Sequence, residues 1–352
     1  MTQIRITISA LASPEIGTGH LRRMMALAEG FLDDLRIALC IHTTALGAEI
    51  LKGHPFPPDR VALAIAPDDP AVAAIQLAGL LRAQPSHAVI VDNYYWRAET
   101  ETVLRQPGTL LCVVDDLADR PHLADVLIDQ NANQTDAAYR GLVPVNCRLG
   151  VGSRFCLLSR PFREQRARGI PDPAARIARD QIFISLGGGD PNRDLPRILH
   201  NLLELTDLRL SVATGSHVPD AAALRALAAA RPDRIELALD SDRVAEQMQA
   251  SAMAIAAGGT MTWERAVLGL PTLCLVIADN QVATAVWMED QGMHRTFDMR
   301  GGWQDADFAA AFRAFAGDDA ALMNYARRSS ALVDGRGVQN AVALIRDEIA
   351  VA

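Results

Sequence analysis

The residues best suited to chemistry near the start of the chain are Gly17-Thr18-Gly19-His20. They follow a stretch in which isoleucine alternates with polar residues, as in a strand, and they precede apolar residues at helical spacing. The two glycines allow a tight turn and let a ligand approach the backbone closely. His20 at the start of the helix is suited to taking a proton from water at neutral pH, as a general base does. The alternative is that this histidine only caps the helix or packs in the core.

A second candidate site is the turn at Gly258-Gly259-Thr260, with Glu264 about one helical turn further on. Two glycines before a helix let a diphosphate approach free backbone amides, and the helix dipole favours its negative charge. The Thr260 hydroxyl can add a hydrogen bond, and the Glu264 carboxylate can accept from both hydroxyls of a ribose. The same residues also fit a plain turn in which Glu264 merely suits the positive end of a helix.

Two further polar pairs each follow a predicted strand. Asn280 and Gln281 come after one apolar run, where their amides can read a sugar or a phosphate, or where Asn280 simply caps a helix. Asp92 and Tyr94 come at the end of another run. An acid and an aromatic ring there suit the face of a sugar, although the aromatic residues of this segment can instead cover the core.

The adjacent carboxylates Asp115 and Asp116 invite a metal-binding interpretation, because carboxylate oxygens are common ligands of divalent cations. Capping of the next segment explains them more simply. The five cysteines form no C-x-x-C pair, which favours buried free thiols in a reducing compartment over a zinc site. We therefore expect neither a metal ion nor a cofactor.

The elements that position these residues indicate two α/β domains. The chain has 352 residues, of which 50% are hydrophobic, enough for two domains of roughly 150 residues each. Apolar runs alternate with helical patterns, which is typical of doubly wound parallel sheets covered on both faces. We place an N-terminal Rossmann-like domain at 1–158, a linker rich in proline and arginine at 159–178, and a C-terminal Rossmann-like domain with a helical tail at 179–352. Ligands of such sheets bind at the carboxyl ends of the strands, here in the expected cleft between the domains.

The charge balance argues against a nucleic-acid partner. Lys and Arg number 34 and Asp and Glu 42, a net charge of −8, and no long basic block interrupts the sequence. The N-terminus lacks the pattern of a secretion signal, and no run of 18 apolar residues is present. We expect a cytoplasmic protein with no stable membrane insertion and no obligate protein partner.

Four motifs follow one another in the chain. They are Ile16-Gly17-Thr18-Gly19-His20 with Arg23, residues 114–117 followed by His122 and Asp125, residues 185–191 including Gly188, and residues 257–264 with Asn280-Gln281. Their ordered set resembles the UDP-2,4-diacetamido-2,4,6-trideoxy-β-L-altropyranose hydrolases of pseudaminic acid biosynthesis, and the resemblance runs from about residue 4 to about residue 295. Those hydrolases share the two-domain GT-B fold of the MurG-type glycosyltransferases.

The resemblance implies metal-independent hydrolysis of a UDP-sugar at the anomeric carbon, with inversion, releasing UDP and a free sugar for a nonulosonic acid pathway such as flagellin glycosylation. A metal is not needed if backbone amides hold the charge of the leaving UDP. The implied roles are general base for His20, sugar binding for Asp92 and Tyr94, diphosphate binding for Gly258, Gly259 and Thr260, ribose binding for Glu264, sugar or phosphate binding for Asn280 and Gln281, and further substrate contacts for Gly17, Gly19, Arg23 and Gly188.

One departure from the family lies at Ser9, Ala10 and Leu11, where the family carries an arginine and an aspartate. These side chains could help to shape the sugar pocket, so the sugar itself stays open. The main alternative function is a GT-B glycosyltransferase with a UDP-sugar donor, and a non-catalytic binder and a UDP-sugar 2-epimerase rank below it. A MurG-type transferase is expected to carry an apolar patch rimmed by basic residues, and the sequence of the N-terminal domain shows no such cluster.

Overall fold

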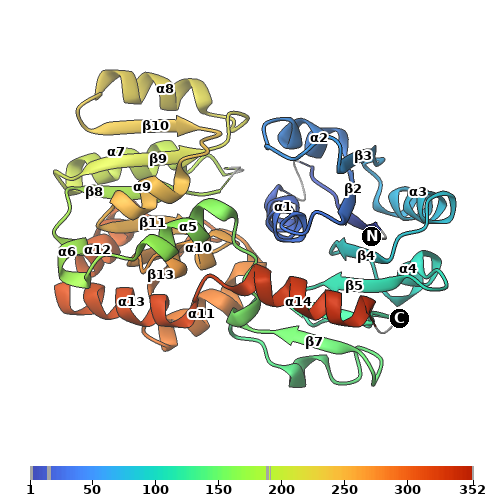
Figure 1. Ribbon diagram of the computed structural model, residues 1–352. Helices are drawn as coiled ribbons and strands as arrows, with labels where there is room; N and C mark the ends of the chain where they lie inside the picture. The colour runs from blue at the N-terminus through green and yellow to red at the C-terminus, as the bar shows by residue number, and fades with distance from the viewer. Residues whose placement is uncertain (1–2, 14–16, 188–189, 191, 351–352) are drawn as a thin grey trace. The chain divides into compact units, whose positions relative to one another are not determined.

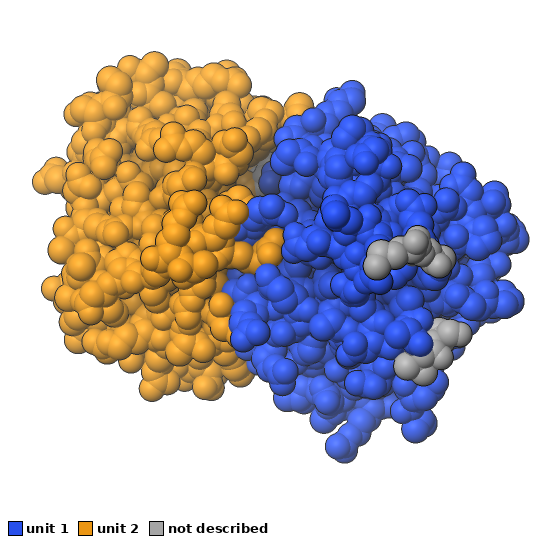
Figure 2. All heavy atoms as spheres, in the orientation of Figure 1, with its two compact units in different colours: residues 1–160, 335–352 blue, residues 161–334 orange. Residues whose placement is uncertain are grey.

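The computed structural model describes residues 3–13, 17–187, 190 and 192–350, which belong to two compact units (Figure 1). Unit 1 comprises residues 1–160 and 335–352, and unit 2 comprises residues 161–334 (Figure 2). Each unit is built on one sheet in which every strand pair is parallel. The predicted class, two doubly wound α/β domains, is therefore confirmed.

Unit 1 has a seven-stranded sheet in the order β3-β2-β1-β4-β5-β6-β7. The order reverses between β1 and β4, and ligands of such sheets bind outside the carboxyl ends of the strands at this point. The strands are β1 (Ile4–Ala10), β2 (Ile37–Thr43), β3 (Val61–Ile65), β4 (Ala88–Asp92), β5 (Leu110–Val114), β6 (Val126–Asp129) and β7 (Arg148–Val151).

Helices cover both faces of this sheet because alternate strand residues point to opposite sides. Ile6 and Ile8 of β1 pack in one core with Phe31, whereas Val89 of β4 packs in the opposite core with Leu77. The helices of unit 1 are α1 (Gly19–Leu32), α2 (Ala45–Lys52), α3 (Pro70–Ala83), α4 (Ala98–Leu104) and α14 (Gly337–Ile349), with 3-10 turns η1 (Asp136–Tyr139) and η2 (Ser153–Phe155).

Unit 2 repeats the plan with a six-stranded sheet in the order β10-β9-β8-β11-β12-β13. Its order reverses between β8 and β11. The strands are β8 (Gln181–Ser185), β9 (Arg209–Thr214), β10 (Ile235–Leu239), β11 (Met253–Ala257), β12 (Thr272–Val276) and β13 (Arg295–Asp298). The helices are α6 (Pro173–Ile177), α7 (Leu195–Leu205), α8 (Ala221–Ala230), α9 (Val244–Ala250), α10 (Met261–Val267), α11 (Val282–Asp290), α12 (Asp305–Ala316) and α13 (Asp319–Leu332), with the 3-10 turn η3 (Asp279–Gln281).

The segment predicted as a linker, 159–178, is largely helical. It contains α5 (Arg160–Arg168), which begins at the last residue of the first part of unit 1, and then α6. The many arginines of α5 obscured its pattern, because only Phe162 and Gln165 of this helix are buried.

The helical tail differs from the sequence-based division, because α14 belongs to unit 1 rather than to the C-terminal domain. Figure 1 shows α14 beside the strands of unit 1, where Val338 and Ile345 join the core that contains Phe31 of α1. The two helices approach closely at Gly30, since a Cβ atom there would lie 2.4 Å from Val338 Cγ1. An apolar stripe in a sequence predicts that one helix face is buried but does not identify its partner.

Candidate active site

His20 lies in the first turn of α1 and is 6% exposed. Its Nδ1 atom is 2.5 Å from Oδ1 of Asp92, the last residue of β4. The switch point between β1 and β4 brings together these two residues, which are 72 positions apart. Nη2 of Arg23 also lies 3.0 Å from Nδ1. Because an ionised carboxylate can only accept hydrogen bonds, its contact with Nδ1 favours the neutral tautomer that carries the proton on Nδ1 and leaves Nε2 to accept one.

Arg23 holds the carboxylate of Asp92 from one helical turn further along α1. Its Nε donates to Oδ2 at 2.5 Å and its Nη2 donates to Oδ1 at 2.6 Å. Burial opposes ionisation of Asp92, but Arg23 and His20 together hold the pKa of this carboxyl well below its ordinary value. Both residues are at most 3% exposed. The resemblance assigns Arg23 and Asp92 to the substrate, and the structure shows them hydrogen-bonded to each other and in contact with Nδ1 of His20.

Tyr94 and Asp116 complete this cluster. The Tyr94 hydroxyl donates to Asp116 Oδ2 at 3.1 Å, and Nη1 of Arg23 donates to the same oxygen at 2.7 Å. The Tyr94 ring meets the His20 ring edge-on, with centroids 4.3 Å apart. Burial and the neighbouring carboxylate raise the pKa of Tyr94, so its hydroxyl stays protonated and can donate. Sequence reasoning considered Asp116 as a metal ligand, as a cap and as part of the motif at 114–117, but it did not predict the contacts with Arg23 and Tyr94, although its place after β5, next to β4, marked it as a neighbour of Asp92.

The turn that presents His20 depends on Gly17. Gly17 has φ 77°, in the left-handed region that favours glycine, and its amide donates to the carbonyl of Ser13 at 2.8 Å. Thr18 then forms the N-cap of α1, and Gly19 is the first helical residue. Ile16 of the predicted motif lies outside the described residues.

A second buried network lies behind the first. His122 Nδ1 is 2.6 Å from Glu101, and Arg120 pairs with Asp115 at 2.9 Å. The Tyr139 hydroxyl lies 3.0 Å from Asp115 Oδ2 and 2.8 Å from Oδ2 of Asp129 in β6. Burial raises the pKa of the Asp129 carboxyl to about 7.

The two carboxylates that suggested a metal site thus have other partners. Asp115 pairs with Arg120, and Asp116 binds Arg23. Over the part of the chain that the structure describes, no group of three or more His, Cys, Asp and Glu side chains is arranged to hold a metal ion.

In unit 2, the predicted diphosphate turn follows β11 at the switch point of the sheet. Gly258 is buried, and a Cβ atom there would lie 3.2 Å from Cys274 Sγ and 3.3 Å from Gln281 Cβ. The structure therefore brings Gly258 and Gln281 side by side. Gly259 is exposed and has open space where a Cβ would lie, and Thr260, also exposed, makes no side-chain cap to α10.

The remaining predicted residues of unit 2 lie around this turn. Glu264 is half-buried in the first turn of α10, and Asn280 is exposed in η3. Gln281 Oε1 accepts from the amide of Ile277 at 3.0 Å, so one end of that amide is already engaged. Gly188 lies outside the described residues.

Sequence reasoning missed Arg265, which is 2% exposed beneath the same turn. Its Nη1 donates to the carbonyl of Ala257 at 3.0 Å and its Nη2 to the Thr262 hydroxyl at 3.2 Å. The guanidinium thereby ties the end of β11 to α10. An arginine in an apolar helix is the signal that could have identified it, since a buried arginine requires several acceptors.

The residues that depart from the family lie in the interior. Ser9, Ala10 and Leu11 are each at most 1% exposed. The Ser9 hydroxyl is 2.9 Å from Nδ1 of the buried His42. These side chains therefore pack within unit 1 and are covered by its own residues.

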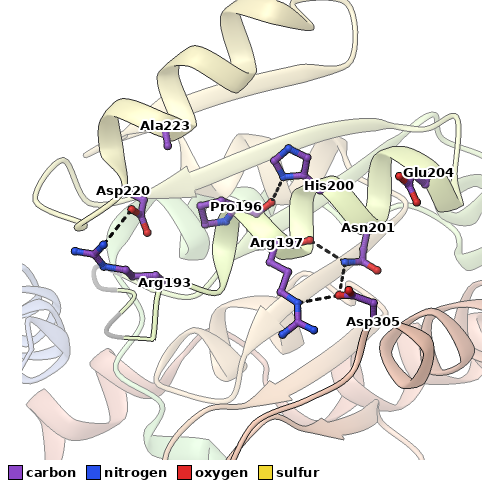
Figure 3. Close-up of a pocket in the computed structure, with 9 residues that line it drawn as sticks. All are labelled: Arg193, Pro196, Arg197, His200, Asn201, Glu204, Asp220, Ala223 and Asp305. Atoms are coloured by element: carbon purple, nitrogen blue, oxygen red, sulfur yellow. Dashed lines mark hydrogen bonds and ion pairs between the residues drawn. The ribbon is translucent and has the colours of Figure 1, made fainter.

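A cavity of about 610 Å³ opens elsewhere in unit 2, between α7, α8 and the start of α12 (Figure 3). Its lining charges are largely paired, with Arg193 3.8 Å from Asp220 and Arg197 2.8 Å from Asp305. None of the residues predicted for the site lines this cavity. No helix of the described chain is long and apolar enough to cross a bilayer.

Comparison with known proteins shows similarity in sequence to a UDP-sugar hydrolase. No family model matches the chain. The chain is 23% identical over 290 residues to the UDP-2,4-diacetamido-2,4,6-trideoxy-β-L-altropyranose hydrolase of Campylobacter jejuni. The matched region covers 82% of this chain and 97% of that protein.

Solved structures resemble the whole chain. MurG of Acinetobacter baumannii has a TM-score of 0.67 at 15% identity and covers 98% of this chain and 99% of its own. The calicheamicin glycosyltransferase CalG4 has a TM-score of 0.64 at 13% identity and covers 99% of each chain. The chain therefore has the GT-B fold, and its predicted resemblance to the altropyranose hydrolase is confirmed over most of its length.

Proposed function

We propose that the chain hydrolyses a UDP-linked 2,4-diacetamido-2,4,6-trideoxyhexose at the anomeric carbon, with inversion. The products are UDP and a free sugar for pseudaminic acid biosynthesis. The observation that carries this proposal is the buried Asp92–His20 pair at the switch point of unit 1, which leaves Nε2 as a proton acceptor. The similarity to the Campylobacter hydrolase over 82% of the chain supports it.

The reaction needs one base and one site for the leaving group. The oxygen of water bonds to the anomeric carbon while the bond from that carbon to the β-phosphate oxygen breaks. The bonding electron pair leaves with UDP, and the proton of the water goes to His20 Nε2. Asp92 then faces an imidazolium, whose charge it stabilises.

Unit 2 supplies the binding of UDP in this proposal. The backbone at Gly258 and Gly259 and the Thr260 hydroxyl bind the diphosphate. Glu264 accepts from the ribose hydroxyls, and Asn280 and Gln281 bind the sugar or its phosphate. Amides that hold the charge of the leaving diphosphate make a metal ion unnecessary, so we propose a metal-independent reaction.

The cysteines bear on the place of the reaction. All five are free thiols in the structure, and free thiols persist in a reducing compartment. We propose a cytoplasmic location and a UDP-sugar as the partner of the chain.

Proton NMR of the protein with UDP-2,4-diacetamido-2,4,6-trideoxy-β-L-altrose, in buffer with EDTA and no acceptor, tests the function. We expect UDP and a free sugar of inverted configuration from the wild type, and none from His20→Asn, which should keep its affinity for UDP within a few-fold. UDP-GlcNAc serves as the control substrate. Turnover by His20→Asn at the wild-type rate would exclude His20 as the base.

The second candidate is a GT-B glycosyltransferase, which the likeness to CalG4 favours. A transferase would bind the UDP-sugar in this experiment and release sugar only after an acceptor is added. Tight binding without turnover would therefore support the transferase.

A further inference from the structure

The buried charges around His20 do not balance when its imidazole is neutral. Arg23 contributes one positive charge, and Asp92 and Asp116 contribute two negative charges. The side chains of these three residues are 3%, 1% and 12% exposed, so water screens them poorly. A proton on His20 Nε2 would bring the sum to zero.

The charged groups further away leave this imbalance in place. Arg120 Nη1 lies 2.9 Å from both the buried Asp115 and the exposed Asp119, so its one positive charge leaves no surplus to offset Asp92 and Asp116. Glu101 is paired with His122 at 2.6 Å. Asp129 lies next to Asp115 with its carboxyl pKa raised by burial, and it adds little negative charge below neutral pH. Tyr94 faces His20 as a neutral phenol.

Asp116 also determines where Arg23 lies. Its Oδ2 accepts both from Nη1 of Arg23 and from the Tyr94 hydroxyl, and its Oδ1 is buried without a hydrogen-bond partner among the described residues. The hydrogen bond from Arg23 positions the guanidinium that binds Asp92. The hydrogen bond from Tyr94 positions the phenol ring that packs edge-on against the His20 imidazole.

We infer that Asp116 is a positioning residue for His20: through Arg23 it holds Asp92 against the imidazole, and its charge favours the protonated imidazole that forms when water is activated. This inference rests on the proposed function for its role in catalysis. Its electrostatic part concerns the protonation of His20 alone and can be measured without any substrate.

The test follows the His20 imidazole by NMR in protein labelled with ¹⁵N-histidine, with the signal assigned from its loss in His20→Asn. We expect the pH of half-protonation to fall by about one unit in Asp116→Asn, because a nearby opposite charge is removed. Asp119→Asn is the matched control, since this exposed carboxylate follows three residues later in the same loop and its loss should leave the titration unchanged.

Kinetics provide the second measurement. In the active enzyme, Asp116→Asn should lower kcat by about tenfold, which is less than the loss expected when a general base is removed, because His20 is still present. KM should change by less than about twofold. Asp116→Glu should restore part of kcat, because the charge returns. A titration of His20 in Asp116→Asn that matches the wild type would overturn the inference, even in an active enzyme.

Failure of the proposed function gives a different result. A wild type that hydrolyses no UDP-sugar removes the catalytic role but leaves the NMR comparison intact. Should Asp116→Asn not fold, Tyr94→Phe replaces it. That variant removes one donor to Asp116 and keeps its charge, so we expect the pH of half-protonation of His20 to rise or stay unchanged, and a fall would contradict the inference.

Discussion

Arg23 grips Asp92 with two parallel hydrogen bonds, from Nε to Oδ2 at 2.5 Å and from Nη2 to Oδ1 at 2.6 Å. This bidentate geometry fixes the plane of the carboxylate. Since Asp92 Oδ1 also lies 2.5 Å from His20 Nδ1, the orientation of the imidazole is determined by an arginine one helical turn away.

Asp92→Asn should reduce kcat by at least about 100-fold, because the neutral amide no longer selects the tautomer that leaves Nε2 free or stabilises the imidazolium. The Kd of UDP should change by less than about twofold, since the proposed UDP site lies in unit 2. Steady-state kinetics and calorimetry measure the two quantities. Full activity in Asp92→Asn would show that His20 does not depend on this carboxylate.

Glu264→Ala should weaken UDP binding by about 5- to 150-fold, as expected when ribose hydroxyls lose an acceptor worth about 1–3 kcal/mol. The control is 2′-deoxy-UDP, which lacks one of these hydroxyls. The loss caused by the substitution should be smaller for this ligand. Equal losses for both nucleotides would rule out a contact between Glu264 and the 2′-hydroxyl.

Asp129 should make the stability of unit 1 depend on pH. Its folded-state pKa of about 7 lies above the unfolded value of about 3.9, so the folded protein binds more protons between these two values. The contribution of this carboxyl to the free energy of unfolding is therefore fully present below about pH 4. It is lost as the pH rises through 7, and the total loss is up to about 4 kcal/mol.

Asp129→Asn should remove this dependence, because an amide stays neutral over the whole range. Urea unfolding at pH 5 and pH 8 measures the effect, and the wild type should lose more stability than the variant between the two. Asp136→Asn, at an exposed carboxylate of η1, is the control and should behave like the wild type. The same slope in Asp129→Asn as in the wild type would assign the pH dependence to another group.

Gly30→Ala should lower the free energy of unfolding by about 1–3 kcal/mol, because its Cβ would lie 2.4 Å from Val338 Cγ1 at the contact of α1 with α14. Val338→Ala is destabilising by itself because this side chain is fully buried. Gly30→Ala should nevertheless cost less in the Val338→Ala background than in the wild type, since the smaller side chain makes room for the methyl group. The matched control is Gly79→Ala in α3, where the new Cβ would meet only the end of Arg82, 4.0 Å away. That control should be neutral or stabilising, by up to about 1 kcal/mol.

An equal cost of Gly30→Ala in the wild type and in the Val338→Ala background would show that the two residues do not meet. It would also leave the docking of the C-terminal helix on unit 1 without support. Chemical unfolding monitored by circular dichroism measures the free energies of the wild type, the two single variants, the double variant and the Gly79→Ala control.

The local patterns of the sequence determine the elements themselves. The spacing of apolar residues predicts a helix over 195–205, and α7 spans Leu195–Leu205. The alternation of isoleucines predicts the first strand, and Ile6 and Ile8 of β1 are both buried in one core. These signals are strong because each element buries one face, which imposes its period on the sequence.

The sequence by itself also placed His20 and Asp92 after strands, on the edge where ligands bind, but it did not show that they touch. The pairing of β1 with β4 decides that, through contacts between segments about eighty residues apart. The packing of α14 on unit 1 likewise depends on the close approach of Val338 to Gly30. The hydrophobic periodicity of either helix does not predict this contact. Tertiary structure alone decided these contacts, because long-range pairing depends on how complete surfaces match and not on the pattern of any one segment.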